Sequence, residues 1–245
     1  MKTVGLIGCG AIGTVLAEAI GRKLVVCDEL VLFDFDQAKA EHLKSSLAFP
    51  TTIVSSLDDL LKCKPAVIVE AASQQAVKAY VPRIVAEGID VIVMSSGALL
   101  ELDVCMSKVH VPSGAIGGID AITSAALAGE VAVTLTTTKN PKALETQDKT
   151  PKVIYEGDAQ EAARLFPREM NVAATLALAV KPAKVKVTVI ADPNVKRNTH
   201  KIVVKWKFGE MLLQFSNDPH PDNPRTSALA AWSAIKLLQT LLLKQ

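Results

Sequence analysis

The sequence predicts an α/β fold: a doubly wound parallel sheet followed by a smaller α+β domain with a mixed or antiparallel sheet. Through residues 1–108, short apolar runs alternate with helical segments, as in parallel sheets whose strands are joined by helices. Residues 109–222 contain longer strands rich in Val, Thr and Lys, which are typical of a half-exposed sheet. An Ala- and Leu-rich helix within 223–245 is expected to pack back on the first domain.

The composition indicates an ordinary globular protein. Of the 245 residues, 49% are hydrophobic, and the formal net charge is +2. No basic tract indicates a nucleic-acid partner, and no apolar run approaches the ~20 residues that cross a bilayer. The N-terminus leads directly into a strand, so we expect no secretory leader and a cytoplasmic protein. The cysteines are scattered and are expected to be reduced thiols, with no metal site: Cys9, Cys27, Cys63 and Cys105.

The first strand leads into a glycine-rich turn, GCGAIG, that opens a helix. Gly8 allows the tight turn, Gly10 lets the backbone approach a pyrophosphate, and Gly13 lets the helix lie close to the strand. The phosphates would lie at the helix N-terminus, at Ala11 and Ile12, where N–H groups and the helix dipole favour anions. This pattern predicts a Rossmann domain that binds a dinucleotide.

A second apolar run, 30–33, ends in Asp34 at the offset expected for the acid that binds the ribose. Its carboxylate would accept hydrogen bonds from the ribose hydroxyls and repel a 2′-phosphate, which favours NAD. The next three residues include no Arg or Lys, but Lys39 is near enough to leave NADP possible.

The remaining elements of the first domain follow the same alternation. We expect helices at 37–47, 56–62 and 74–87, and strands at 52–54, 66–70 and 90–94. Ligands of doubly wound sheets collect beyond the carboxyl ends of the strands. The segments 70–73 and 95–98 are therefore expected to face the coenzyme, with Ala72 and Ser73 as contacts.

The second domain is expected to begin with a glycine-rich loop at 113–120 that opens a helix ending near 128. Further helices are expected to end at 166–167 and to cover 169–179, and an exposed loop is expected at 142–152. Strands are predicted at 130–138, 184–191, 199–208 and 211–216, and turn and cap residues at 223–227. Long strands with short turns favour an antiparallel sheet.

Side-chain parity along 199–208 predicts the direction of His200. Period two places four apolar residues on one face: Ile202, Val204, Trp206 and Phe208. It places three lysines on the other face: Lys201, Lys205 and Lys207. His200 then points with the covered face, toward the interior or a cleft. From spacing alone it is either an acid/base or a structural histidine, and His42, His110 and His220 are poorer candidates.

Seven segments together resemble the L-aspartate dehydrogenase family. They are GCGAIG at 8–13, EAAS at 70–73, SSGAL at 95–99, GAIGGIDA at 114–121, FPREMNVAATLALA at 166–179, ADPNVKRNTH at 191–200 and NPRTS at 223–227. The resemblance implies an NAD(P)-dependent enzyme that oxidises L-aspartate to iminoaspartate, which feeds NAD biosynthesis or hydrolyses to oxaloacetate and ammonia. It places the active-site histidine at His200, a substrate contact at Asn198, and coenzyme contacts at Ala115 and Asn171.

The reaction implied by the resemblance is consistent with these residues. A neutral imidazole at position 200 would accept a proton from the substrate ammonium or from the water that attacks the imine. Two substrate carboxylates need donors, and the sequence offers four candidates without distinguishing them: Lys139, Arg168, Lys196 and Arg197. Asn171 either holds the nicotinamide carboxamide or caps a helix.

Two other functions remain open at this point. One is another two-domain amino-acid dehydrogenase or reductase, such as a dihydrodipicolinate-reductase-like enzyme. The other is a non-catalytic protein that senses NAD. We also expect a homodimer, because a sheet with one face to cover often finds a partner.

Overall fold

The computed structural model describes residues 2–167, 169–220 and 223–244. The chain divides into two compact units. Unit 1 comprises Met1–Ala98, Leu102–Pro112 and Ala231–Gln245, and unit 2 comprises Leu99–Glu101 and Ser113–Ala230. The main division between the units therefore follows Pro112, four residues after the boundary that we expected.

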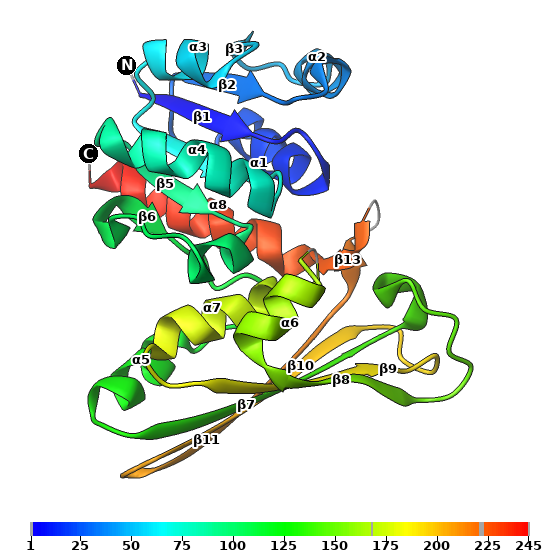
Figure 1. Cartoon of the computed structure of the whole chain (residues 1–245). Helices are drawn as coiled ribbons and strands as arrows, with labels where there is room; N and C mark the ends of the chain where they lie inside the picture. Colours follow the sequence, from blue (N-terminus) through cyan, green and yellow to red (C-terminus); the bar gives the residue numbers. More distant parts are fainter. Residues whose placement is uncertain (1, 168, 221–222, 245) are drawn as a thin grey trace. The chain divides into compact units, whose positions relative to one another are not determined.

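Unit 1 contains a six-stranded parallel sheet with strand order β3-β2-β1-β4-β5-β6 (Figure 1). The strands are β1 (Thr3–Ile7), β2 (Glu29–Phe33), β3 (Thr51–Ile53), β4 (Val67–Glu70), β5 (Asp90–Val93) and β6 (Val109–His110). The strand order reverses between β1 and β4, which creates the crevice where doubly wound sheets bind their ligands. The predicted fold of the first domain is confirmed.

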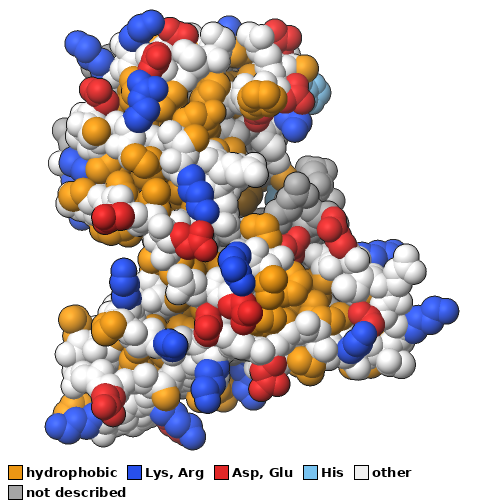
Figure 2. All heavy atoms as spheres, viewed as in Figure 1, with side chains coloured by type: hydrophobic (Ala, Val, Ile, Leu, Met, Phe, Trp, Pro, Cys, Tyr) orange, Lys and Arg blue, Asp and Glu red, His pale blue; other side chains and the backbone are white. Residues whose placement is uncertain are grey.

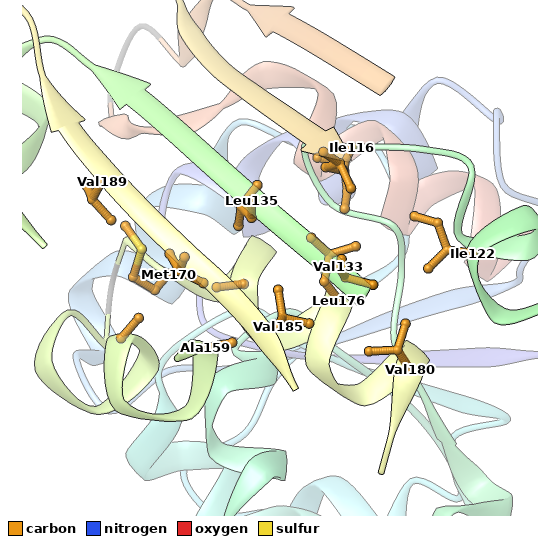
Figure 3. Packing of buried hydrophobic residues seen from close by; sticks show 14 of the residues in the cluster. Ile116, Ile122, Val133, Leu135, Ala159, Met170, Leu176, Val180, Val185 and Val189 are labelled. Carbon is orange, nitrogen blue, oxygen red and sulfur yellow. The ribbon is translucent and has the colours of Figure 1, made fainter. Parts of the chain in front are cut away.

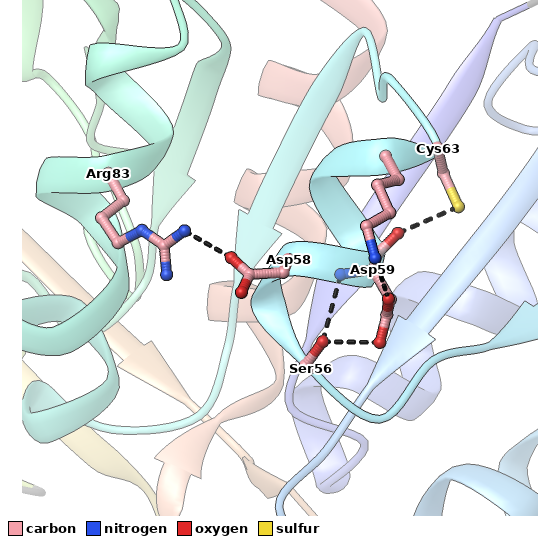
Figure 4. A network of polar contacts seen from close by, with 6 residues as sticks. Ser56, Asp58, Asp59, Cys63 and Arg83 are labelled. Carbon is pink, nitrogen blue, oxygen red and sulfur yellow. Dashed lines mark hydrogen bonds and ion pairs between the residues drawn. The ribbon is translucent and has the colours of Figure 1, made fainter.

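The helices of unit 1 connect these strands. They are α1 (Ala11–Gly21), α2 (Gln37–Ser45), α3 (Leu57–Lys62), α4 (Gln74–Ala86), the first part of the short 3₁₀ helix η1 (Ser96–Leu100), the 3₁₀ helix η2 (Met106–Lys108), and most of α8 (Ala228–Leu243). Ser56 caps α3 by accepting a hydrogen bond from the Asp59 N–H, and Asp58 pairs with Arg83 of α4 (Figure 4). The C-terminal end of α8 is held within unit 1 by a 2.7 Å hydrogen bond from Lys2 Nζ to the Leu242 carbonyl.

Unit 2 contains a five-stranded mixed sheet with strand order β11-β10-β7-β9-β8. The strands are β7 (Val131–Lys139), β8 (Lys152–Asp158), β9 (Val185–Ala191), β10 (Asn198–Trp206) and β11 (Gly209–Asn217). β7 and β9 are parallel and the other pairs are antiparallel, so the purely antiparallel sheet that the strand lengths favoured is wrong and the mixed alternative holds. The helices that separate β7 from β9 in sequence supply the crossover that parallel pairing needs.

One face of this sheet is covered by α5 (Ile119–Leu127), α6 (Ala159–Leu165) and α7 (Asn171–Val180) (Figure 1). The core lies between these helices and the strands, and Figure 3 shows Leu135, Val185 and Leu176 packed within it. Along β7, every second residue is buried from Val133 to Lys139. The helices therefore set which face of each strand is dry.

The side chains of β10 follow the predicted parity with one exception. His200, Ile202 and Val204 are buried, whereas Lys201 and Lys205 are exposed. Phe208 was expected on the covered face, but it is 67% exposed because the strand ends at Trp206 and Phe208 lies in the turn before β11.

Three further sequence expectations for the second half are corrected. The segment 142–152 is not a uniformly exposed loop, since Ala143 and Leu144 in the 3₁₀ helix η3 (Pro141–Leu144) are buried. Strand β8 begins at the last residue of that segment and was not predicted. The segment 223–227 forms strand β13 (Asn223–Ser227), paired with β12 (Pro219–His220), and not a turn.

The surface carries charges of both signs. On the face drawn in Figure 2, basic and acidic side chains are interspersed among hydrophobic ones. Within the described residues, none of the helices combines the length and apolar composition that crossing a bilayer requires.

Candidate active site

The glycine turn of unit 1 has a different steric requirement at each glycine. Gly8 has φ +98°, and a Cβ there would lie 2.7 Å from the Ala71 carbonyl oxygen. A Cβ at Gly13 would lie 2.1 Å from the Gly8 carbonyl oxygen, so only glycine lets α1 approach the turn this closely. Around a Cβ at Gly10 there is nothing within 4 Å, which leaves the backbone accessible to a ligand.

Asp34 lies directly against this turn. One carboxylate oxygen accepts a 2.7 Å hydrogen bond from the Cys9 N–H, and the other accepts a 2.8 Å bond from the Asp36 N–H. Lys39 is exposed, and its ammonium is 3.8 Å from the Asp36 carboxylate. The Cys9 thiol is buried, and burial followed by repulsion from Asp34 raises its pKa to about 12, which makes it a poor nucleophile.

Beyond β4, the two predicted contacts Ala72 and Ser73 are exposed at the start of α4. Ser73 caps that helix, because its hydroxyl accepts a hydrogen bond from the Ala76 N–H at 3.1 Å. The buried Glu70 carboxylate accepts hydrogen bonds from the N–H groups of both contacts at 2.9 Å. Glu70 belongs to the segment 70–73 that we expected to face the coenzyme, but no role was predicted for its side chain.

In unit 2, His200 is 2% exposed on the helix-covered face of β10. It lies opposite Thr137 of β7 in the antiparallel register, and 3.0 Å separate its Nδ1 from the threonine hydroxyl oxygen. Burial, and in second place repulsion from the Lys139 ammonium, lowers the pKa of His200 to about 3. The imidazole is therefore neutral at physiological pH.

Lys139 is the basic residue that the structure brings to this face. It is 3% exposed, two residues after Thr137 on β7, and its Nζ is 3.5 Å from the Glu169 carbonyl oxygen. Burial lowers the pKa of Lys139 to about 8, and attraction to the Glu169 carboxylate opposes only part of this shift. A buried lysine of this kind favours an anion beside it.

The other described candidates for a carboxylate donor lie elsewhere. Lys196 and Arg197 are exposed, and Arg197 Nε is 2.9 Å from an Asp218 carboxylate oxygen. Arg168 lies outside the described residues. Of the described candidates, only Lys139 shares the dry face with His200.

Asn198 is 2% exposed, and its position two residues before His200 places it on the same face of β10. Its amide nitrogen is 3.5 Å from the Ser227 hydroxyl. The neighbouring strand contributes Asn217, whose side-chain N–H donates a 2.8 Å hydrogen bond to the Ala115 carbonyl. Asn171 is the first residue of α7 and is partly buried.

The predicted site residues thus fall into two groups. Unit 1 contains Gly8, Gly10, Ala11, Ile12, Gly13, Asp34, Ala72 and Ser73, and unit 2 contains Ala115, Asn171, Asn198 and His200. Sequence reasoning did not identify Thr137 or Asn217, because threonine and asparagine carry no signal until a pairing register places them.

Among the described residues, no group of three or more His, Cys, Asp or Glu side chains could hold a metal ion.

The geometry of the glycine turn fits a dinucleotide. Two of its glycines make close backbone approaches that a side chain would block, and the third leaves open space at the N-terminus of α1. The Asp34 carboxylate adjoins the turn at the end of β2, as expected for the ribose-binding acid.

Two family models match most of the chain. The model for the NAD-binding domain of homoserine dehydrogenase matches residues 8–107, and the model for the C-terminal domain of aspartate dehydrogenase matches residues 120–241. Together with the six-stranded parallel sheet, these matches define a dehydrogenase whose coenzyme is NAD.

Similar proteins identify the family within this class. An L-aspartate dehydrogenase of Methanococcus maripaludis is 40% identical, over 98% of this chain and 97% of its own, and that of Archaeoglobus fulgidus is 43% identical, over 97% of each. The solved aspartate dehydrogenase of Thermotoga maritima is 29% identical, with a TM-score of 0.73 over 98% of this chain and 97% of its own. The chain belongs to the L-aspartate dehydrogenase family, whose members are oxidoreductases acting on a CH–NH₂ group.

Proposed function

We propose that this protein oxidises L-aspartate to iminoaspartate, which water converts to oxaloacetate and ammonia, and that this reaction serves NAD biosynthesis. The observation that carries the proposal is the pairing of a buried neutral imidazole with a buried lysine on one face of unit 2. The first can accept a proton and the second can attract a carboxylate. Similarity to L-aspartate dehydrogenases over nearly the full chain supports the choice of substrate.

His200 acts as the base in this proposal. Loss of hydride from Cα requires an uncharged amine, so a proton must first leave the ammonium. In the free protein, burial and, in second place, the charge of Lys139 make His200 a weak base. A bound dicarboxylate adds negative charge beside the ring and offsets that repulsion, so it raises the pKa of His200 toward the range in which imidazole accepts protons.

Thr137 defines which ring nitrogen is available. Its hydroxyl is 3.0 Å from Nδ1 of His200. If Nδ1 carries the ring proton and its N–H donates a hydrogen bond to the threonine oxygen, Nε2 is the basic nitrogen and is directed to the substrate. The proton taken from the substrate ammonium is then held on Nε2 until it passes to water.

Lys139 and Asn198 bind the substrate in this proposal. The Lys139 ammonium attracts one carboxylate, and the Asn198 amide donates a hydrogen bond to the other or orients the substrate amine. Both side chains are almost fully buried, which strengthens these interactions relative to water.

The coenzyme would be held by the glycine turn, with the pyrophosphate at Ala11 and Ile12 and a ribose at Asp34, and by contacts at Ala72, Ser73, Ala115 and Asn171. NAD supplies the acceptor for the hydride that leaves the substrate Cα. The Asp34 carboxylate would repel a 2′-phosphate, so we propose that NADP is used less well than NAD.

An assay of the purified protein tests the proposed function. We expect NADH formation with L-aspartate and NAD at alkaline pH, and none with D-aspartate, L-glutamate or L-malate. Consumption of NADH with oxaloacetate and ammonia should confirm the reverse direction. Normal NADH binding without turnover of any amino acid would instead indicate a sensor, and turnover of dihydrodipicolinate would indicate the reductase-like alternative.

We also propose that the protein is a cytoplasmic homodimer. The sheet of unit 2 presents a second face with exposed Leu212 and partly buried Val203, which a second copy could cover. The four cysteines are free thiols, as expected in a reducing compartment. Light scattering of the purified protein measures the molar mass of the assembly, and the mass of a monomer at micromolar concentration would contradict the proposed homodimer.

A further inference from the structure

Glu70 is a carboxylate buried without any exposed surface, at the carboxyl end of β4. We propose that Glu70 is a positioning residue that shapes the two segments beyond β4 and β5 to receive the nicotinamide half of the coenzyme. The proposal concerns the NAD site of unit 1 and does not depend on the identity of the substrate.

The hydrogen bonds of Glu70 join two separate segments. Oε1 accepts from the Ala72 and Ser73 N–H groups at 2.9 Å and from the Ser95 hydroxyl at 3.0 Å. Oε2 accepts from the Ser95 N–H at 3.1 Å. All four donors belong to the segments that follow β4 and β5. None of them belongs to the strand ladder itself, so the carboxylate shapes the loops and not the sheet.

Glu70 lies where the strand order reverses. It pairs in register with Ile7 of β1 on one side and with Val93 of β5 on the other. The next residue, Ala71, donates its N–H to the Ile7 carbonyl at 2.8 Å, and its own carbonyl is the atom that a Cβ at Gly8 would meet. The carboxylate therefore controls a segment that packs directly against the glycine turn.

The same two segments make a second contact. A Cβ at Gly97 would lie 2.2 Å from the side-chain amide nitrogen of Gln74, so Gly97 and the first residue of α4 are closely packed. Asp34 on the β2 side receives the adenosine ribose, and a dinucleotide crosses the point where strand order reverses. The nicotinamide half then extends over β4 and β5, where Glu70 and Ser95 meet.

The four donors require the ionised form of the side chain. Burial raises the pKa of Glu70, and the hydrogen bonds from Ser95, Ala72 and Ser73 oppose this rise. A neutral carboxyl would direct its own O–H at one of these donors, and an amide would direct an N–H at one. An uncharged substitute of the same shape therefore leaves at least one of the four donors without its acceptor.

The test substitutes Glu70→Gln and measures coenzyme binding by calorimetry without substrate. We expect the Kd of NADH to rise about tenfold, the change expected from losing one charge-assisted hydrogen bond. The Kd of ADP, which contains only the adenosine and pyrophosphate, should change less than about twofold. Ser95→Ala removes one of the four donors and should give a smaller rise for NADH.

Two controls separate positioning from a general loss of structure. Glu87→Gln makes the same change of charge at an exposed position just after α4 and should leave both affinities unchanged. Hydrogen exchange of the Ala72, Ser73 and Ser95 N–H groups should accelerate in Glu70→Gln while strand β5 stays protected. Unchanged NADH affinity would overturn the proposal, as would an equal loss of NADH and ADP affinity. In the wild-type protein, normal NADH binding without turnover of L-aspartate would contradict the proposed function instead.

Discussion

His200 and Lys139 are two basic side chains that the fold removes from water, and the charge of Lys139 makes protonation of His200 less favourable. Both pKa values are lowered mainly by burial. Burying two basic side chains on one face costs folding free energy, so stability alone does not account for the pair. Perturbed pKa values of this size cluster at functional sites. The pair is therefore the residue-scale feature on which the proposed chemistry depends.

Replacing His200 by Ala should lower kcat about 10²–10⁴-fold, the usual contribution of a positioned general base. The Kd of NADH should stay within about twofold, because the glycine turn and Asp34 belong to unit 1. Steady-state kinetics and NADH titration measure the two effects. His42→Ala, at an exposed position on α2, is the control. Weakened NADH binding with intact turnover would instead make His200 structural.

Replacing Lys139 by Met should raise the KM for L-aspartate about tenfold or more while kcat changes less, because a carboxylate loses its cationic partner. In the wild-type protein, KM should rise as the pH passes above about 8, where Lys139 loses its proton. KM profiles from pH 7 to 10 should show this rise in the wild type and in the exposed control Lys196→Met, and a flat profile for Lys139→Met. Parallel profiles in all three proteins would exclude Lys139 as the anchor.

At the residue scale, the sequence predicted the burial of His200 because strand parity alone decides it. It could not choose Lys139 among four basic candidates, since its burial depends on the helices that cover β7. Thr137 was not predicted because its role depends on the register between β7 and β10, two strands that lie far apart in the sequence.

At the scale of elements, the turn between β1 and α1 allows stability and binding to be separated by two substitutions. Gly10→Ala introduces a methyl group into open space at φ −82°, and Ala is a poorer N-cap for α1 than Gly, so the free energy of unfolding should fall by less than about 1 kcal/mol. NADH affinity should nevertheless fall, because the methyl occupies the space through which a pyrophosphate approaches.

Gly13→Ala should lower both the stability and the NADH affinity, because its Cβ would meet the Gly8 carbonyl oxygen and the backbone must shift. Overpacking of this kind destabilises by about 1–3 kcal/mol. Urea unfolding and NADH titration measure the pair of variants. Equal stability losses in both would show that the space around Gly10 is not open.

The elements that the sequence missed are those whose partners are distant or weak. Strand β8 lies at the edge of its sheet, Val153 in it is 51% exposed, and its sequence lacks an apolar stripe. The Asn-Pro pair that opens β13 is typical of a turn, but backbone pairing with the two-residue β12 overrides that local preference. Local signals predicted the helices and buried strands much better, because burial on both faces leaves a continuous apolar run.

At the scale of the whole molecule, the two-part plan was predictable because the two halves have different sequence patterns. The parallel pairing of β7 with β9 was not, since strand length and alternation do not specify which strands become neighbours. Family resemblance assigned the active-site role to His200, which the structure shows to be buried on β10, and that role stays a prediction.

Stability should depend on pH through His200. Its pKa is about 3 in the folded protein and near 6.5 when unfolded, so the unfolded chain binds a proton first as the pH falls. Between pH 6.5 and 4.5 the wild type should lose about 2–3 kcal/mol more stability than His200→Gln, which carries no titrating group there. Urea unfolding at the two pH values measures the difference, in which the contributions of other groups cancel. Equal losses would mean that His200 is protonated in the folded state.

The alternation along β10 restricts which insertions and deletions this protein can tolerate. A residue inserted between His200 and Ile202 would rotate the imidazole to the side where Lys201 and Lys205 project, while the apolar residues after it kept their places. The same insertion in the turn at 207–208 would leave the imidazole buried. Variation in chain length should therefore be confined to the distal end of the hairpin, and the spacing between positions 198 and 204 should be invariant in any active relative.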